Sequence, residues 1–366
     1  MTKASEKQES NSDWFANARK PIIIAGPCSA ETRDQVFDTA NQLLDFGKID
    51  LFRAGIWKPR TQPDSFEGVG KIGLPWLRDL RDETGLQITV EVAKASHVEL
   101  CLEHNIDVLW IGARTTVNPF AVQEIADALR GVDIPVMIKN PINPDLSLWT
   151  GAVQRIRNSG LKDIAVIHRG FSYFGENFYR NRPMWQIAIE FMRRHPEIPM
   201  ICDPSHICGR RDILFDVSQK AMDLDYDGLM IETHIDPDNA WSDAMQQITP
   251  EVFASMMSSI EFRSDHQDNK KLQSKLEQLR DTIDHIDEEI INLLANRMLL
   301  ARDIGKYKKD NNMTIYQARR WNEIIERSLN QASKTKLSKE FILKYINTVH
   351  DESIDQQEQV MKKMDD

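Results

Sequence analysis

The chain has 366 residues, of which 41% are hydrophobic, enough for more than one packed core at about 100–200 residues per domain. Its formal net charge of −10 argues against a nucleic-acid binder, and no apolar run approaches the roughly 18 residues that a membrane helix needs. The start MTKASEKQES carries no signal-peptide pattern, and the 4 cysteines are irregularly spaced, as in a protein with reduced thiols. We therefore expect a cytoplasmic protein without nucleic-acid or membrane partners.

Residues 1–20 form a polar segment for which the sequence predicts no element. From residue 21, apolar runs alternate with amphipathic stretches of helical spacing. The runs are continuously apolar, which is typical of strands buried on both faces and hence of a parallel sheet. The predicted strands are Ile22–Gly26, Asp50–Gly55, Gln87–Val92, Val108–Ala113, Pro135–Asn140, Ile164–Gly170, Met200–Asp203 and Gly228–Glu232. Helices are predicted at Asp34–Phe46, Ala95–His104, Pro119–Leu129, Gly151–Asn158, Met184–Arg194 and Asp212–Met222.

Eight βα units in about 240 residues predict a closed (β/α)₈ barrel, here over residues 21–261. A doubly wound open sheet is the alternative. It is disfavoured because no GxGxxG turn follows the first strand.

The character of the chain changes after Phe262. RSDHQDNKK is polar and charged, so residues 262–270 are predicted to be a linker. From Leu272 to Lys309 apolar residues keep helical spacing, which predicts one helix of about 38 residues, roughly 57 Å long. Two shorter helices follow, at about Tyr316–Gln331 and Leu337–Met361. Because so long a helix cannot bury its apolar stripe against two short partners, residues 271–366 are predicted to pair with a second copy of the chain.

Four residues with metal-binding side chains follow three of the predicted strands. Cys28 follows the first strand, His206 the seventh and Glu232 ends the eighth, while Asp243 lies in the loop beyond it. In a closed barrel these strand ends are neighbours, so the four side chains are expected to converge. A thiolate, an imidazole and two carboxylates suit Mn²⁺, Fe²⁺, Co²⁺ or Zn²⁺ better than Mg²⁺ or Ca²⁺.

Cations follow the other strand ends. Lys and Arg rarely end buried strands without a partner, and several of them converging suit a ligand with phosphate or carboxylate groups. Individual pairing with nearby acids is the alternative reading. The residues are Lys58, Arg60, Arg114, Lys139 and Arg169.

The motifs GPCS, KPRT, GAR, DPSH and the final Glu-then-SD pair resemble those of the 3-deoxy-D-arabino-heptulosonate 7-phosphate (DAHP) synthases, over about Pro21–Ser258. That family condenses phosphoenolpyruvate with erythrose 4-phosphate, releases phosphate and opens the shikimate pathway. The resemblance implies that Cys28, His206, Glu232 and Asp243 bind one divalent metal ion, with Mn²⁺ the first candidate. It also implies that Arg114, Lys139 and Arg169 hold phosphoenolpyruvate. Lys58, Arg60 and Thr61 of KPRT would position erythrose 4-phosphate, with Lys58 in a catalytic role.

A metal acting as Lewis acid would polarise the aldehyde for attack by the enol carbon, and fixed cations would stabilise the charge of both substrates. The alternative by chemistry is 3-deoxy-octulosonate 8-phosphate synthase, which shares the barrel and phosphoenolpyruvate. Its aldehyde loop characteristically has Asn where this chain has Pro59, so Pro59 favours the four-carbon aldehyde.

The segment of about Leu272–Gln357 resembles the all-helical chorismate mutases, which are intertwined dimers. That family converts chorismate to prephenate without a cofactor. The resemblance implies that arginines bind the two carboxylates, while Lys308 and Gln357 bind the ether oxygen as charge develops there. The arginines carried over are Arg280, Arg297 and Arg320.

Two positions depart from the mutase pattern. Gln317 stands where the family often has an acidic residue, and Trp321 where it often has Glu. Because Trp321 cannot accept a hydrogen bond from a substrate hydroxyl, another residue must do so or the contact is missing. The sequence thus predicts a bifunctional DAHP synthase and chorismate mutase. The alternative is a DAHP synthase whose catalytically weak tail dimerises the chain and senses chorismate or prephenate; feedback regulation through the tail is compatible with both readings.

Overall fold

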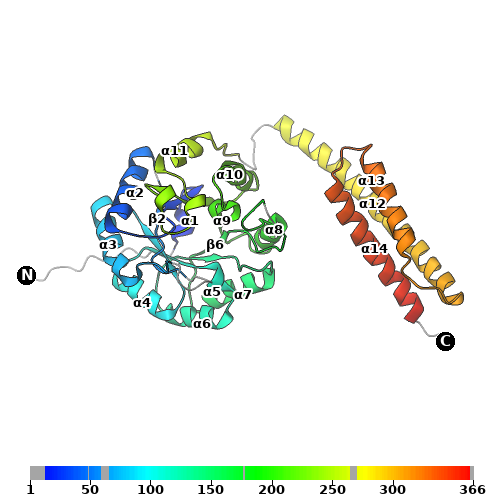
Figure 1. The fold of residues 1–366 in the computed structure, drawn as a ribbon, viewed down its shortest axis with the longest axis horizontal. Helices are drawn as coiled ribbons and strands as arrows, with labels where there is room; N and C mark the ends of the chain where they lie inside the picture. The colour runs from blue at the N-terminus through cyan, green and yellow to red at the C-terminus, as the bar shows by residue number, and fades with distance from the viewer. Residues whose placement is uncertain (1–12, 48, 59–65, 176–177, 264–269, 363–366) are drawn as a thin grey trace, which may run out of the picture. The chain divides into compact units, whose positions relative to one another are not determined.

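The computed structural model describes residues 13–362, apart from 48, 59–65, 176–177 and 264–269, and the side chains of 270 and 271 also lie outside the described part. The chain divides into two compact units, residues 1–265 and 266–366 (Figure 1). The predicted linker at 262–270 falls mostly on residues outside the described part. No described helix has the length and apolar character needed to cross a membrane.

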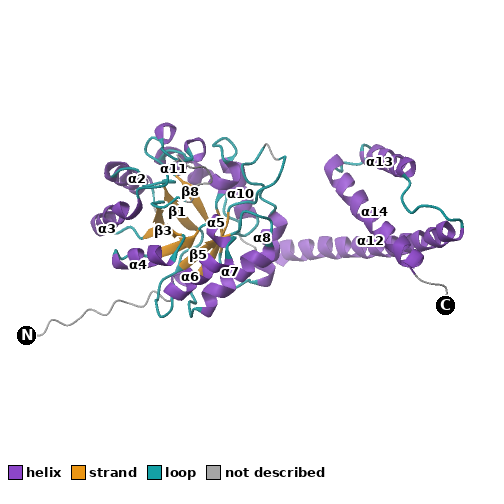
Figure 2. Ribbon diagram, turned by 60° about the horizontal axis from the view of Figure 1, so that its bottom comes forward, coloured by secondary structure: helices purple, strands orange, loops and turns teal. Residues whose placement is uncertain are grey.

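The first unit is a closed barrel of parallel strands in the order β1 to β8, as predicted (Figure 2). Strand β8 pairs with β1 from Ile22↔Gly228 to Gly26↔Glu232 and so closes the barrel. Nearly every strand residue is buried, as continuous apolar runs predict. The strands are β1 Ile22–Gly26, β2 Leu51–Arg53, β3 Ile88–Val92, β4 Val108–Ile111, β5 Val136–Lys139, β6 Ile164–His168, β7 Met200–Cys202 and β8 Gly228–Glu232.

Helices surround the strands and pack their apolar faces on the barrel's outer surface. Several begin at a side-chain cap; for example, the Thr32 hydroxyl accepts from Gln35 N. The helices of this unit are α1 Trp14–Asn17, α2 Arg33–Phe46, α3 Gly73–Thr84, α4 Ala95–Glu103, α5 Ala113–Thr116, α6 Pro119–Ala128, α7 Leu146–Asn158, α8 Trp185–Arg194, α9 Pro204–Cys208, α10 Leu214–Asp223 and α11 Pro250–Ser259. Short 3₁₀ turns lie at η1 Gly70–Ile72, η2 Pro237–Asn239 and η3 Ala244–Gln246.

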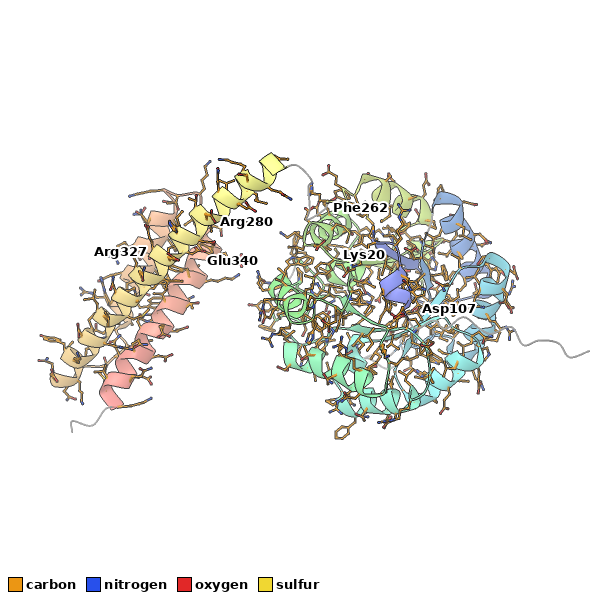
Figure 3. The ribbon with its side chains drawn as sticks, turned by 180° about the vertical axis from the view of Figure 1, so that it is seen from behind. Lys20, Asp107, Phe262, Arg280, Arg327 and Glu340 are labelled. Carbon is orange, nitrogen blue, oxygen red and sulfur yellow. The ribbon has the colours of Figure 1, made fainter. Side chains whose placement is uncertain are left out.

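The N-terminal segment is more than the polar stretch that the sequence analysis describes. Helix α1 places Phe15, 1% exposed, in the inner core among side chains such as Trp110 and Met137. The Asp163 carboxylate accepts hydrogen bonds from the main-chain nitrogens of Trp14 and Phe15, and Figure 3 shows nearby Lys20 over the centre of the barrel. Two aromatic residues in a polar context gave no periodic signal, so their role was not predicted.

The second unit consists of three helices: α12 Lys270–Asp310, α13 Ala318–Ala332 and α14 Lys339–Lys362. Helix α14 packs against both of the others. Helix α12, the long helix that the sequence predicts, has 41 residues. Much of its apolar stripe stays exposed in the single chain, each of the following side chains by 42% or more: Leu272, Leu276, Leu279, Ile283, Ile286, Ile290, Leu293 and Ile304.

Candidate active sites

Barrel closure brings three of the predicted metal ligands together. Cys28 lies two residues after β1, and Glu232 ends β8 opposite Gly26. Asp243 precedes η3 in a left-handed conformation, with φ of 50°, which turns the loop back over the strand ends. The ligand atoms of Cys28, Glu232 and Asp243 lie within 4.8 Å of one another, and Cys28 Sγ is 3.3 Å from Asp243 Oδ2.

His206 approaches the same group from α9, the short helix that follows β7. Asp203 caps this helix by accepting from His206 N at 3.1 Å, and its carboxylate lies 2.8 Å from His206 Nδ1. This contact directs the other ring nitrogen, Nε2, to within 3.8 Å of Glu232 Oε1. Because Asp203 fixes one imidazole nitrogen, the other faces the acidic group, and His206 borders the cluster of the other three predicted ligands on the side of Glu232.

Hydrogen bonds hold the returning loop in place. Gln247 Oε1 accepts from Cys28 N at 2.8 Å, while its Nε2 donates to Ser242 O at 2.8 Å. The Ser29 and Ser242 hydroxyls are also bonded, and Glu31 accepts from Trp241 N at 2.7 Å. The loop after β8 is thereby tied to the segment after β1, which fixes Asp243 relative to Cys28.

Three cations balance the acids of this group. Arg53 Nη2 lies 3.0 Å from Glu232 Oε1, and Arg180 Nη1 lies 3.2 Å from Asp243 Oδ1. Lys58 Nζ contacts Cys28 Sγ at 3.2 Å and also donates to the Cys28 carbonyl. A cation thus lies beside each of the three candidate ligands, as expected where several acidic groups converge.

The pKa values follow from burial and these neighbours. Burial, with the Glu232 charge, raises the pKa of the Cys28 thiol to about 12. Burial also opposes ionisation of Asp243, but Arg180, His206 and Lys58 outweigh it and hold the pKa of Asp243 below its ordinary value. Without a bound cation Cys28 is therefore a neutral thiol beside ionised carboxylates. A divalent ion would favour the thiolate, because a coordinating thiol is deprotonated.

The predicted cations gather beside this group. Lys139 ends β5 and is buried, with Nζ 2.8 Å from Asp203 Oδ2. Arg169 follows β6, is 8% exposed and donates to Asn181 Oδ1 at 2.7 Å. Burial lowers the pKa of Arg169 to about 10, and the nearby Arg180 and Arg114 add to this effect although Asp203 opposes it. Clustered guanidinium groups that repel one another form a binding place for an anion.

Of the other residues predicted for the barrel site, the structure describes only Arg114. Arg114 lies on α5 and is exposed. Arg60 and Thr61 lie outside the described residues.

Two cations of the site were not singled out from the sequence. Arg53 lies inside the apolar run of β2, is 1% exposed, and its Nε and Nη1 have no hydrogen-bond partner. A charged residue within such a run is itself a signal that sequence reasoning could have used. Arg180 gave no such signal, because its place depends on main-chain bonds of the β6–α8 loop to α9, such as Arg180 N to Cys208 O.

In the helical unit, three predicted residues lie where α12 and α14 pack. Arg297 donates to the Ser353 hydroxyl and, at 3.4 Å, to Val349 O. Lys308 is 8% exposed, and its Nζ donates to Ile315 O. Gln357 Nε2 donates to Ser353 O at 3.1 Å, and its Oε1 is buried without a partner. Helices α12 and α14 approach closely where Gly305 faces Gln357.

The other two arginines lie elsewhere on the helical unit. Arg280 lies near the start of α12 (Figure 3), about 26 Å along the axis from Arg297 at 1.5 Å for each of 17 steps. Arg320 is exposed and paired with Glu323 Oε2 at 3.1 Å. The single chain therefore does not bring Arg280 to Arg297 and Lys308.

Comparison with known proteins is consistent with two functional units. Residues 5–266 match the DAHP synthetase I family, and residues 279–358 match chorismate mutase type II. The chain is 32% identical over 243 residues to the phospho-2-dehydro-3-deoxyheptonate aldolase of Thermotoga maritima, a match that covers 66% of this chain and 70% of that protein. It is 27% identical over 265 residues to a 2-dehydro-3-deoxyphosphooctonate aldolase of Rhodopseudomonas palustris, covering 67% of this chain and 88% of the relative.

Two solved DAHP synthase structures are similar to the larger part of the chain. The crystal structure of the Thermotoga maritima DAHP synthase superposes with a TM-score of 0.59 at 30% identity, covering 70% of each chain. A truncated form of the same bacterium's synthase gives a TM-score of 0.57 at 28% identity, covering 70% of this chain and 87% of that one.

The buried Arg53–Glu232 pair yields a prediction about stability. Replacing Arg53 by Met should destabilise the metal-free barrel by about 3–5 kcal/mol, because the Glu232 carboxylate would stay buried without its cation. The double variant Arg53→Met with Glu232→Gln should recover most of this loss, and urea unfolding of both measures it. Equal stability of the single and double variants would show that Glu232 does not depend on Arg53.

Proposed function

The chain belongs to the DAHP synthetase I family and carries a chorismate mutase type II domain, and from this premise we propose a metal-dependent bifunctional enzyme. Both domains serve aromatic biosynthesis. The barrel would condense phosphoenolpyruvate with erythrose 4-phosphate to DAHP and phosphate, and the helical unit would rearrange chorismate to prephenate. The observation that carries the first half is the convergence of Cys28, Glu232 and Asp243 within 4.8 Å, beside buried cations.

The donor set fits one divalent ion of the borderline class. Cys28, His206, Glu232 and Asp243 would hold it, and Mn²⁺ is the first candidate among Mn²⁺, Fe²⁺, Co²⁺ and Zn²⁺. When bound, the ion would supply Lewis-acid polarisation of the aldehyde. Arg53 and Arg180, which pair with Glu232 and Asp243, and Lys58, which contacts Cys28, would add positive charge beside the ion for an anionic substrate.

The cationic side of the barrel mouth would bind phosphoenolpyruvate. Lys139, Arg169 and Arg114 would hold its phosphate and carboxylate, and the unpartnered Nε and Nη1 of Arg53 are further donors for the same anion. Lys58 would act beside the aldehyde, with Arg60 and Thr61 positioning erythrose 4-phosphate. Fixed donors in a buried site stabilise developing charge without reorganisation.

The alternative to this function differs in the aldehyde substrate. The relatives include 2-dehydro-3-deoxyphosphooctonate aldolases, such as that of Rhodopseudomonas palustris at 27% identity. The higher identity to the heptonate enzyme and Pro59 in KPRT favour the four-carbon aldehyde. Arabinose 5-phosphate is the competing substrate to assay.

The mutase half would require a second copy of the chain. Arg297, Lys308 and Gln357 would bind chorismate where α12 and α14 pack, and Arg320 of α13 would leave its exposed pairing with Glu323 to bind a carboxylate. Arg280 lies too far along α12 to reach the same molecule, so we assign it to the site of the partner copy. The half-exposed apolar stripe of α12 supports such a homodimer, because a second α12 would cover it.

The assay that tests the proposal uses full-length protein depleted of metal and then restored with Mn²⁺. Phosphate release from phosphoenolpyruvate and erythrose 4-phosphate should require the metal, because a metal supplies several kcal/mol of stabilisation. Chorismate loss should not change. Metal-independent phosphate release would contradict the assignment of the four ligands, and release only with arabinose 5-phosphate would favour the alternative.

Single substitutions should separate the two activities. Cys28→Ala should lower DAHP formation by about 100-fold or more and leave chorismate loss intact. Arg297→Ala should lower chorismate loss by about 100-fold and leave DAHP formation intact, because a fixed donor to the substrate charge is removed. Arg319→Ala is the matched control, since that side chain is 94% exposed on α13. An unchanged mutase rate in Arg297→Ala would refute its role.

We further propose that the tail regulates the barrel through prephenate or chorismate, which requires that ligand binding to the helical unit favour a less active arrangement. Saturating prephenate should lower the rate of DAHP formation in the full-length enzyme. Prephenate should not lower DAHP formation by Arg297→Ala, because this variant lacks a residue of the proposed prephenate-binding site. An unchanged rate in the unmodified enzyme would contradict regulation by that compound.

A further inference from the structure

Three polar side chains of helix α14 lie on one face of the helix, near Arg297 and Lys308 of α12. His350, Ser353 and Gln357 are spaced i, i+3 and i+7, so they lie along one line of the helix. Ser353 accepts from Arg297 of α12. Within the described part of the helical unit, the buried side-chain polar atoms that lack a hydrogen-bond partner are His350 Nε2 and Gln357 Oε1. Buried polar atoms are nearly always paired, so both point to a missing ligand.

The imidazole of His350 is held by aromatic stacking. Its ring centroid lies 3.9 Å from that of Trp321 on α13, with an interplanar angle of 13°. The ring centroid of Tyr316 lies 6.3 Å from that of His350. Stacking fixes the plane of the ring and therefore the direction of its nitrogen edge. Trp321 thus has a partner, although it replaces the Glu that the mutase pattern often has here.

The neighbours of His350 favour its neutral form. Burial lowers the pKa of His350, Asp351 opposes this effect, and Arg297 and Lys308 add to the lowering. A neutral imidazole keeps one nitrogen as a hydrogen-bond acceptor, which neither arginine nor lysine provides. Gln317, the other candidate acceptor at this end of α13, is exposed and caps no helix nitrogen with its side chain.

The chemistry of chorismate matches this set of groups. The molecule has two carboxylates and an ether oxygen, all of which accept hydrogen bonds from the cations. Gln357 would donate to the ether oxygen only with its amide turned, because its Nε2 donates to Ser353 O here. Its ring hydroxyl is the one group that donates, and it needs an acceptor. We propose that His350 Nε2 accepts the hydrogen bond from the ring hydroxyl of chorismate, with Trp321 fixing the imidazole plane. This assignment rests on the mutase half of the proposed function and names a specificity-determining residue for it.

The test uses the full-length enzyme and two substrates: chorismate and the analogue in which hydrogen replaces the ring hydroxyl. Each rate is divided by the uncatalysed rate of the same compound. The unmodified enzyme should lose about tenfold or more in kcat/KM on the analogue, because a buried acceptor is left without its donor. His350→Phe, which keeps an aromatic ring against Trp321, should lose a similar factor on chorismate and nothing further on the analogue.

His350→Gln provides the rescue, since its amide oxygen can take the place of Nε2, and it should stay within about threefold of the unmodified enzyme on chorismate. DAHP formation and helicity in the same preparations establish that each variant is folded. Equal losses of His350→Phe on both substrates, or no loss on either, would overturn the proposal. If His350→Phe does not fold, failure of the unmodified enzyme to discriminate between the two substrates overturns it. An unmodified enzyme that consumes no chorismate would instead refute the mutase half itself.

Discussion

The pairing of β8 with β1 is the constraint on which the barrel site depends. Glu232 and Cys28 are more than 200 positions apart in the sequence, yet the register Gly26↔Glu232 places them side by side. The same closure lets the loop after β8 return over the strand ends, where Gln247 and Ser242 tie it to the segment around Cys28. If β8 shifted along β1 by one residue, Glu232 would point to the other face of the sheet.

The acidic and basic side chains of the site balance one another's charge. Glu232, Asp243 and Asp203 are countered by Arg53, Arg180 and Lys139, at separations of 2.8–3.2 Å. In the two buried pairs, Arg53–Glu232 and Lys139–Asp203, each charge offsets the cost of taking its partner out of water, so removal of one member would leave the other buried and unpaired. The acids and the cations therefore keep each other in place.

The sequence predicts the barrel well because its strands are buried on both faces and so are continuously apolar. Strand ends could be assigned to within one or two residues, and Cys28, His206, Glu232 and Lys139 could be chosen as candidates because chemistry-bearing residues follow such runs. Arg180 and Phe15 could not be found this way, since loop contacts and a short terminal helix leave no periodic pattern. His350 was missed for a related reason: its role depends on stacking against Trp321, which lies 29 positions earlier on another helix.

The contact at Gly305 has a consequence for how the helical unit can vary. A Cβ atom at this position would lie 3.1 Å from Gln357 Cα, closer than neighbouring atoms tolerate without moving. The short distance between α12 and α14 at this point therefore requires that residue 305 have no side chain. One added carbon there would push the two helices apart by a few tenths of an ångström. Natural variation at residue 305 would thereby change the distance between Lys308 on α12 and Gln357 on α14 while both side chains stayed the same.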